Sequence, residues 1–261
     1  MALYQNLIVE EESNVVILTL NNPERRNPLT EETKTEMIAA LKDIGNNASQ
    51  RSLVITGKGK AFCAGGDLKK IGKIPTEKEI RQIMGKSQEL LKSLMGLEKP
   101  VIAAVNGDAY GMGCNLALAS DFVLASHQAR FCEVFIKLGI TPDFGALYML
   151  PRLVGLWKSK ELAYLGRVVE AKEAERIGLI TRALPPHELM AEAMALAKKL
   201  AQMPTQAIGR AKRILNRAFQ MTLDDVLEEE IKNQIHLTQT KDHAEGLKAL
   251  MEKRKPVFQG K

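Results

Sequence analysis

The chain has 261 residues, of which 45% are hydrophobic and 26% charged, and its formal net charge is +6. This length and apolar content argue against a disordered chain and predict one large domain, or one domain with a small appendage. Its three cysteines lack Cys-x-x-Cys spacing and its four histidines lack the spacing of a metal site or a triad, so we expect neither a disulfide framework nor a metal.

The positive charge is spread along the chain, since acidic residues lie among the lysines and arginines, as in 188–199 and 228–241. This pattern is typical of a solvated surface and predicts no nucleic-acid partner, whereas a mild positive excess suits a ligand with several phosphates. No apolar run approaches the roughly 20 residues that cross a bilayer, and residues 1–6 contain no basic segment before an apolar core. We therefore expect a cytoplasmic protein without a membrane partner.

Apolar periodicity predicts strands alternating with helices over the first two thirds of the chain. The expected elements are strands at 7–11 and 14–20, a helix at 30–44, a strand at 52–56, a helix at 76–97, a strand at 101–105, a helix at 114–119, and strands at 122–125 and 129–131. From about Leu184 only helical periodicity remains, in 188–202, 204–219, 223–238 and 242–253. The alternation predicts an α/β architecture, and the apolar stripes of the last helices need a partner surface.

Two glycine-containing stretches, 61–68 and 106–115, each follow a buried strand and lead into residues that can start a helix. They read Ala-Phe-Cys-Ala-Gly-Gly-Asp-Leu and Asn-Gly-Asp-Ala-Tyr-Gly-Met-Gly-Cys-Asn. Alone, either stretch would indicate only a tight turn, because glycine is the usual residue of such turns. As a pair of strand-to-helix corners, they can direct two backbone N–H donors at one oxygen.

With their spacing and flanks, these stretches resemble the two signature segments of the crotonase (enoyl-CoA hydratase/isomerase) superfamily, and the resemblance runs from residues 21–23 to 252–254. It implies an α/β fold of the crotonase-like (ClpP/crotonase) type, a spiral of ββα units over residues 1–184. A C-terminal helical oligomerisation region would follow over 185–261. Because this region packs between subunits in crotonases, the resemblance implies a homotrimer or a dimer of trimers.

The resemblance places an oxyanion hole at the backbone N–H groups of Ala64 and Met112. There it would polarise a thioester carbonyl and stabilise the enolate that forms when a proton leaves the acyl chain. Such a site takes an acyl-CoA thioester, so coenzyme A would enter as part of the substrate, with no permanently bound cofactor.

Further residues match the segments that contact coenzyme A in crotonases. They are Arg25, Arg26, Asn27, Leu29, Ala64, Gly65, Gly66, Asp67, Leu68 and Met112. Arg25 or Arg26 would pair with phosphate. Lys253 and Phe258 resemble the tail that reaches the adenine end in several relatives, although simple solvation also explains a basic cluster there.

The reaction depends on the acid and base groups. Enoyl-CoA hydratases carry one Glu three residues after the second oxyanion donor and another four residues before the glycine of a Leu-Gly-x-x-Pro segment, where this chain has Asn115 and Phe135. Neither side chain exchanges a proton at neutral pH. Single-acid isomerases of the family often carry their carboxylate at the Pro-Asp position that Asp143 occupies, so Asp143 is the candidate general base and acid. The alternative is that Asp143 only caps a helix over 144–153.

Glu133 is the candidate second acid, because on a strand its side chain would share a face with Phe135. We interpret the chain as an enoyl-CoA isomerase that shifts a double bond, a Δ3,Δ2-enoyl-CoA isomerase. A 2-enoyl-CoA hydratase using Glu133 or Asp143 is the alternative. A nucleic-acid-binding relative with residual CoA chemistry is a third interpretation, disfavoured because the helix over 30–46 carries Lys34 and Lys42 among acidic residues instead of a basic stripe.

Overall fold

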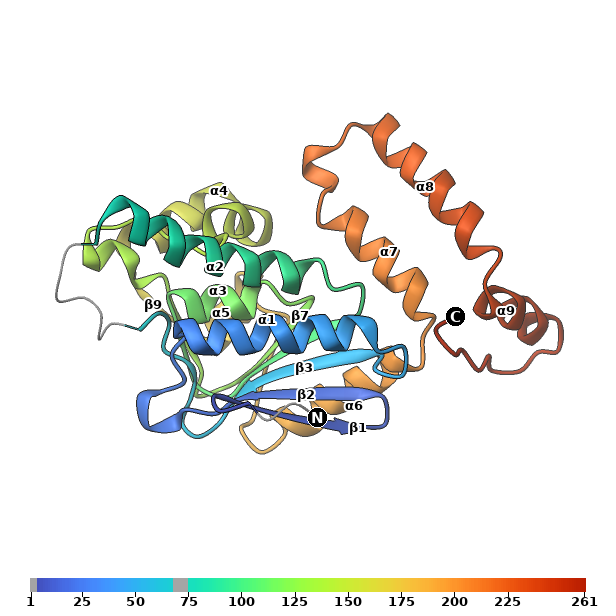
Figure 1. Cartoon of the computed structure of the whole chain (residues 1–261), viewed down its shortest axis with the longest axis horizontal. Coiled ribbons are helices and arrows are strands. Elements are labelled where there is room, and N and C mark those ends of the chain that lie inside the picture. The colour runs from blue at the N-terminus through green and yellow to red at the C-terminus, as the bar shows by residue number, and fades with distance from the viewer. Residues whose placement is uncertain (1–3, 68–74) are drawn as a thin grey trace.

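The computed structural model describes residues 4–67 and 75–261, which form two sheets surrounded by helices (Figure 1). The larger sheet has the spatial order β1 (Leu7–Glu12), β2 (Val15–Leu20), β3 (Ser52–Gly57), β5 (Val101–Val105), β7 (Phe122–Ser126) and β10 (Arg182–Leu184). The smaller sheet has the order β4 (Ala61–Cys63), β6 (Asp108–Tyr110), β8 (Arg130–Cys132) and β9 (Val168–Glu170). Strand pairing is parallel except for β1 with β2 and β8 with β9.

Helices cover both faces of the larger sheet. In chain order, the helices of the described residues, not all of which lie on this sheet, are α1 (Glu31–Asn46), α2 (Glu77–Met95), α3 (Met112–Leu118), α4 (Ala146–Leu165), α5 (Ala171–Arg176), α6 (Leu189–Ala201), α7 (Thr205–Leu215), α8 (Leu223–Leu237) and α9 (Lys241–Met251). The described part of the chain also has the short 3-10 helices η1 (Pro23–Arg25), η3 (Val134–Leu138) and η4 (Ala218–Gln220). In the described ranges 4–67 and 75–261, no helix is both long and apolar enough to pass through a membrane.

The central strands β3 and β5 are buried at every position, because apolar clusters cover both of their faces. Val54 and Ile102 pack toward α6 in one cluster, whereas Leu53 and Val101 belong to the larger cluster that contains residues of α1, α2 and α3. This two-sided burial explains why both strands read as continuous apolar runs in the sequence.

Three pairs of strands that are consecutive along the chain, but lie in different sheets, build the fold: β3 and β4, β5 and β6, and β7 and β8. Each pair places one strand in each sheet, and a helix or 3-10 helix follows it. The turn between β3 and β4 is so tight that a Cβ at Gly57 would lie 2.4 Å from the carbonyl oxygen of Ala61. This succession is the spiral of ββα units that the sequence predicts.

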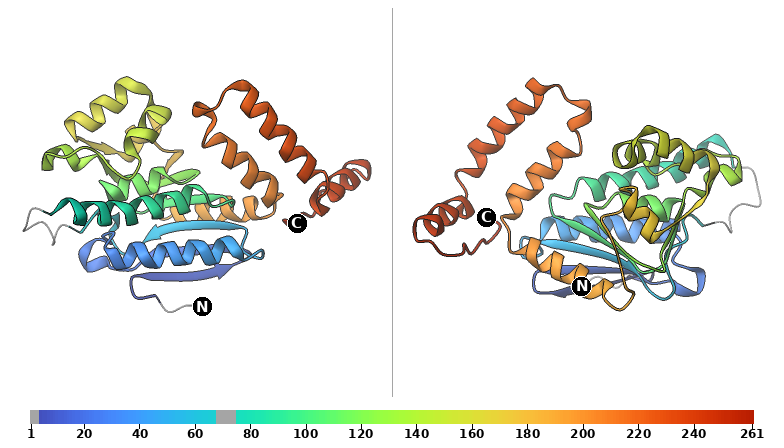
Figure 2. Two further views of the ribbon diagram at one scale, coloured as in Figure 1. Left: turned by 45° about the horizontal axis from the view of Figure 1, so that its top comes forward. Right: turned by 180° about the vertical axis from the view of Figure 1, so that it is seen from behind.

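The predicted division at residues 184 and 185 differs from the packing of the chain. Helix α6 lies on the larger sheet, where Leu189, Ala193 and Ala197 belong to a buried cluster with strand residues. It therefore completes the core. The segment that departs from the core begins with α7, and Figure 1 and Figure 2 show α7, α8 and α9 extending away from the sheets. The small buried alanines of α6 allow this close approach.

Candidate active site

The two glycine corners lie against each other, backbone to backbone. A Cβ at Gly113 would lie 2.2 Å from the carbonyl oxygen of Cys63, and one at Gly65 would lie 2.7 Å from the carbonyl oxygen of Tyr110. Gly65 also has φ 97°, a conformation that side chains rarely adopt. Only glycine fits at these two positions. The close approach also shows that the two corners, which the sequence predicts separately from local patterns, meet at one place.

The backbone N–H of Ala64 is already committed, since it donates to the carbonyl of Arg26 at 2.9 Å. The expectation that Ala64 supplies an oxyanion donor therefore conflicts with the structure. The neighbouring Gly66 forms a parallel bridge with Leu29, in which the Leu29 N–H donates to the Gly65 carbonyl at 2.8 Å. In a parallel bridge, one residue directs its N–H and C=O toward the partner strand and the other directs them away, so here Gly66 is the residue that points away. The Gly66 N–H is thus directed to the side opposite Leu29.

Met112 is the first residue of α3, directly after Gly111, the N-cap residue with φ 53°. First-turn N–H groups of a helix have no intrahelical acceptor. A Cβ built on Gly65 would lie 3.6 Å from the Met112 nitrogen, and one on Gly66 would lie 3.6 Å from the Met112 sulfur. The two residues after Ala64 therefore lie beside Met112, which makes the amides of Gly66 and Met112 the candidate pair of donors.

Asp143 lies on a turn of unusual backbone conformation. The next two residues, Phe144 and Gly145, have φ 49° and 77°, and the phenylalanine is 4% exposed. A bulky residue at positive φ is rare and requires support from its surroundings. Helix α4 begins only at Ala146, its N-cap is Gly145, and this cap makes no side-chain hydrogen bond. The alternative role of Asp143 as a side-chain helix cap is therefore wrong.

The Asp143 carboxyl is half-buried, and its Oδ1 atom is buried without a hydrogen-bond partner among the described residues. Burial raises the pKa of Asp143 to about 6, while the positive charge of Lys34 acts to lower it. A carboxyl that titrates near neutrality suits the transfer of a proton in both directions.

Glu133 and Asn115 lie beside Asp143. The Asn115 Nδ2 atom donates to the Asp143 carbonyl at 3.1 Å and to Glu133 Oε2 at 3.4 Å. Burial raises the pKa of Glu133 to about 7, and the negative charge of Asp143 acts in the same direction, against hydrogen bonds from Asn115 and Cys114. Among the described residues, Asn115 Oδ1 and Glu133 Oε1 are buried without partners, like Asp143 Oδ1. Three such oxygens in one place call for donors from a ligand or water.

Glu133 is not on a strand, contrary to the expectation. It is the N-cap residue of η3, and its exposed fraction is 3%. Phe135 instead packs at the second corner, where its Cζ atom would lie 3.5 Å from a Cβ on Gly111. Because of this 3-10 turn, the Glu133 side chain lies beside Asn115, and Phe135 lines the site at the second corner.

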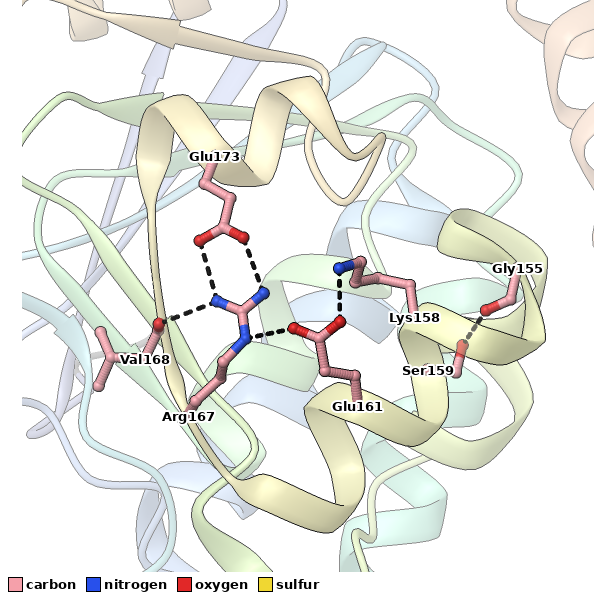
Figure 3. Close-up of polar contacts among 7 residues, drawn as sticks. All are labelled: Gly155, Lys158, Ser159, Glu161, Arg167, Val168 and Glu173. Atoms are coloured by element: carbon pink, nitrogen blue, oxygen red, sulfur yellow. Dashed lines mark hydrogen bonds and ion pairs between the residues drawn. The ribbon is translucent and has the colours of Figure 1, made fainter.

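A network of ion pairs surrounds Arg167 (Figure 3). Arg167 donates to Glu161 at 2.6 Å and to Glu173 at 2.7 Å and 2.9 Å, joining the end of α4 to α5. The preceding Gly166 accepts a hydrogen bond from the Cys132 thiol at 3.3 Å. Glu133 and Arg167 both line a small cavity of about 10 Å³. The ion-pair network therefore lies next to Glu133, across this small cavity.

The model of the family described as enoyl-CoA hydratase/isomerase matches residues 10–261 of the chain. The chain belongs to this family. It is 36% identical to a crotonyl-CoA hydratase of Syntrophomonas wolfei, with 98% of each chain covered. It is 38% identical to a 1,2-epoxyphenylacetyl-CoA isomerase of Escherichia coli, covering 96% of this chain and 97% of the relative. Relatives named for addition of water and for isomerisation thus match to a similar degree.

Solved structures agree on the fold. An enoyl-CoA hydratase structure from Bacillus anthracis superimposes with a TM-score of 0.93 at 36% identity, covering 98% of this chain and 100% of that chain. The protein therefore has the crotonase fold, and as an enoyl-CoA hydratase/isomerase family member it is an enzyme of CoA thioesters.

The residues expected to contact coenzyme A near the first corner divide into two groups. Asn27 is 1% exposed and donates to the carbonyls of Lys58 and Ala61, and Leu29 is buried with its N–H on the carbonyl of Gly65. These two brace the corner. Arg25 is half-buried and pairs with Asp67 at 2.5 Å, whereas Arg26 is exposed. Leu68 lies outside the described residues.

Lys253 and Phe258 do not reach this site within one chain. The Phe258 carbonyl accepts a hydrogen bond from Arg51 at 2.8 Å, and Asp242 accepts from the amides of Gln259 and Gly260. Figure 1 and Figure 2 show this tail at the end of the molecule away from the turn that follows β4. A contact of the tail with the site would have to come from another subunit.

From the sequence, Lys34 counts only as a lysine among the acidic residues of the helix over 30–46, but its side chain is 2% exposed. A signal was available, because Lys34 lies three residues before Met37 and seven before Leu41, in the spacing of the buried stripe of α1.

Proposed function

We propose that this protein is an enoyl-CoA isomerase that shifts a double bond along the acyl chain, with Asp143 as the single proton carrier. The observation that carries the proposal is the half-buried Asp143 carboxyl with an unpartnered oxygen, near the two corners and next to Asn115. Asn115 and Phe135 occupy the positions of the two hydratase glutamates, and neither exchanges a proton.

In the proposed mechanism, the thioester oxygen lies between the amides of Gly66 and Met112. These donors stabilise the negative charge that develops on this oxygen when Asp143 removes a proton from C2 of a 3-enoyl thioester. Asp143 then returns the proton to C4 of the dienolate, which leaves the double bond between C2 and C3. One carboxyl suffices because it acts first as base and then as acid.

Coenzyme A would bind through groups that surround the corners. The exposed guanidinium of Arg26 is available to a phosphate, whereas Arg25 has Asp67 as a partner in the free protein. Lys253 and Phe258 would serve the adenine end only from a neighbouring subunit.

Hydration of a 2-enoyl thioester is the second candidate. A specific feature favours it: Glu133 is buried beside Asn115 with one free carboxyl oxygen, and its pKa near 7 suits a base that activates water. Glu133 would then activate the water molecule, the work that in hydratases falls to the two glutamates at the positions of Asn115 and Phe135.

Rates with two substrate types distinguish the candidates. The purified protein should convert a 3-enoyl-CoA to the 2-enoyl-CoA faster than it adds water to the 2-enoyl-CoA, as followed by chromatography of the thioesters. Faster hydration, abolished by Glu133→Gln, would replace the isomerase proposal with the hydratase one.

We also infer a homotrimer or a dimer of trimers. Large apolar side chains of α4 and α8 are exposed, including Trp157 at 84%, Leu223 at 72% and Ile231 at 55%. A cavity of about 500 Å³ between α4 and α7 is lined by apolar residues such as Leu153 and Leu215. Exposed apolar area on this scale marks a protein interface. Light scattering should give at least three times the chain mass, and a monomer at micromolar concentration would contradict the inference.

A further inference from the structure

Lys34 is an ammonium group enclosed between two helices. It lies on α1, and its Nζ atom donates to Ser87 Oγ at 3.2 Å and to the Ile83 carbonyl at 3.5 Å, both on α2. It also forms an ion pair with Glu31, one turn earlier on α1. The side chain of Lys34 is 2% exposed, whereas that of Glu31 is 32% exposed.

Enclosing an ammonium costs free energy unless its hydrogens find partners, and an apolar side chain of similar volume is often at least as stable in such a place. Ser87, itself 2% exposed, accepts a hydrogen bond from this ammonium and donates one to the Ile83 carbonyl, so its hydroxyl serves only this contact and its own helix. The first half of α2 is otherwise exposed. A methionine or a leucine at position 34 would be enough to hold the two helices together. The positive charge at this position therefore needs another explanation, which we look for in the function of the protein.

The turn that carries Asp143 rests on the same helix. A Cβ at Gly145 would lie 2.7 Å from Leu91 Cδ2, and Leu91 is one helical turn beyond Ser87. Helix α2 thus contacts the Lys34 ammonium and the Asp143 turn through adjacent residues on one face. Lys34 is also the charged residue whose field stabilises the Asp143 carboxylate.

We propose that Lys34 is a positioning residue for Asp143: its enclosed ammonium, held between α1 and α2, keeps the Asp143 carboxyl in the ionised form that accepts the proton from C2. The proposal rests on the role assigned to Asp143 under the proposed function. It goes beyond that role because it assigns the protonation state of the acid to a residue on a different helix.

Two further charged groups bear on the sign of the effect. Glu133, at the start of η3, opposes Lys34, because its charge and that of Asp143 disfavour each other. Glu31 partly neutralises Lys34 as its ion-pair partner. Asn115 from α3 and Ser87 and Leu91 from α2 are uncharged. Removing the Lys34 charge therefore raises the pKa of Asp143 above about 6, and removing the Glu31 charge lowers it.

The test is the pH profile of kcat/KM for isomerisation of a 3-enoyl-CoA by the wild-type enzyme, Lys34→Met, Lys34→Arg and Glu31→Gln. We expect Lys34→Met to move the midpoint of the acidic limb upward by roughly one pH unit. Below that midpoint, kcat/KM should be roughly tenfold lower than in the wild type. Lys34→Arg should keep the midpoint near the wild-type value. Glu31→Gln, at a partly exposed position, should move the midpoint downward even if Lys34→Met folds poorly.

An acidic limb that stays in place in both Lys34→Met and Glu31→Gln overturns the proposal. Asp143→Asn separates this failure from a failure of the proposed function. If Asp143→Asn is inactive and the limb does not respond to Lys34 or Glu31, only the role of Lys34 fails. If Asp143→Asn keeps the wild-type rate and profile, Asp143 is not the base and both proposals fall.

Discussion

The site has two regions, a corner region that presents backbone groups and an acid region that presents side chains. The corners at 63–66 and 111–113 present backbone groups, and their geometry follows from glycines that lie against opposing carbonyls. The acid region presents the side chains of Asp143, Glu133 and Asn115, of which the two carboxyls titrate near neutrality. A backbone donor has no protonation state to lose, so pH and the replacement of titratable side chains should act on the acid region and spare the corners.

The sharpest test of this division is Asp143→Asn. We expect isomerisation to fall by roughly 10²–10⁴-fold, the usual loss on removal of a general acid–base group. CoA affinity, measured by calorimetry, should remain because the corners are intact. Thermal stability should not fall, since Gly145 and not Asp143 is the N-cap residue of α4. It should rise somewhat at neutral pH, because burial raises the pKa of Asp143 to about 6 and its ionised form is therefore unfavourable in the folded state. A nearly silent substitution would place the proton carrier elsewhere.

A substitution at the corners should instead act on folding. In Gly113→Ala the new methyl group would lie 2.2 Å from the Cys63 carbonyl oxygen, and neither backbone can yield. We expect a destabilisation of roughly 3 kcal/mol in chemical denaturation, as for severe overpacking.

Gly85→Ala is the matched control for the corner substitution, since a Cβ there meets nothing within 4 Å on the exposed side of α2. It should stabilise the protein by roughly 0.5–1 kcal/mol. Equal effects of the two substitutions would contradict the view that the corners depend on glycine.

Glu133→Gln should have a smaller effect, visible in stability more than in isomerisation. Burial raises the pKa of Glu133 in the folded protein to about 7 from an ordinary value of 4.5. The folded state therefore favours the protonated form, and Glu133 becomes a burden on stability as pH rises from about 4.5 to about 7. Relative to the wild type, the midpoint of thermal unfolding of Glu133→Gln should gain a few degrees more at pH 8 than at pH 5.

The isomerisation rate of the same variant should fall less than tenfold, because Asp143 carries the proton in the proposed mechanism. Equal stability differences at the two pH values would show that the Glu133 carboxyl is not held in an unfavourable environment. A loss of rate as large as that of Asp143→Asn would make Glu133 part of the proton transfer.

The sequence predicts well those features that depend on local patterns. The corners and the buried strands β3 and β5 follow from glycine placement and apolar runs within short windows, whereas the spiral of ββα units follows from the family resemblance. The identity of the first donor does not, because the Ala64 amide is committed by Arg26 and the Gly66 amide is oriented by Leu29, both distant in sequence. Helix α6 has the same periodicity as the helices after it, so its place on the sheet depends on tertiary packing.

The acid region was predicted only in part, and the reasons are also physical. Asp143 follows from its Pro-Asp position. The enclosure of Lys34 and Glu133 depends on contacts between helices and turns that no local pattern specifies. The 3-10 helix η3 rather than a strand follows Glu133, which reverses the expected relation to Phe135. Charged residues are mostly exposed, so two enclosed ones run against the usual expectation from composition.

The left-handed pair Phe144 and Gly145 makes the acid a separable part of the enzyme. The corners fix the polarising amides through contacts at residues 63–66 and 110–113, and none of those contacts involves the turn at 143–145. Under the proposed function, a change at Asp143 would remove or replace the carboxyl while the binding of a thioester oxygen stays the same. Phe144 would have to stay, because it belongs to the buried core cluster. A scaffold of this kind can diversify among proton-transfer reactions through one polar position of one turn.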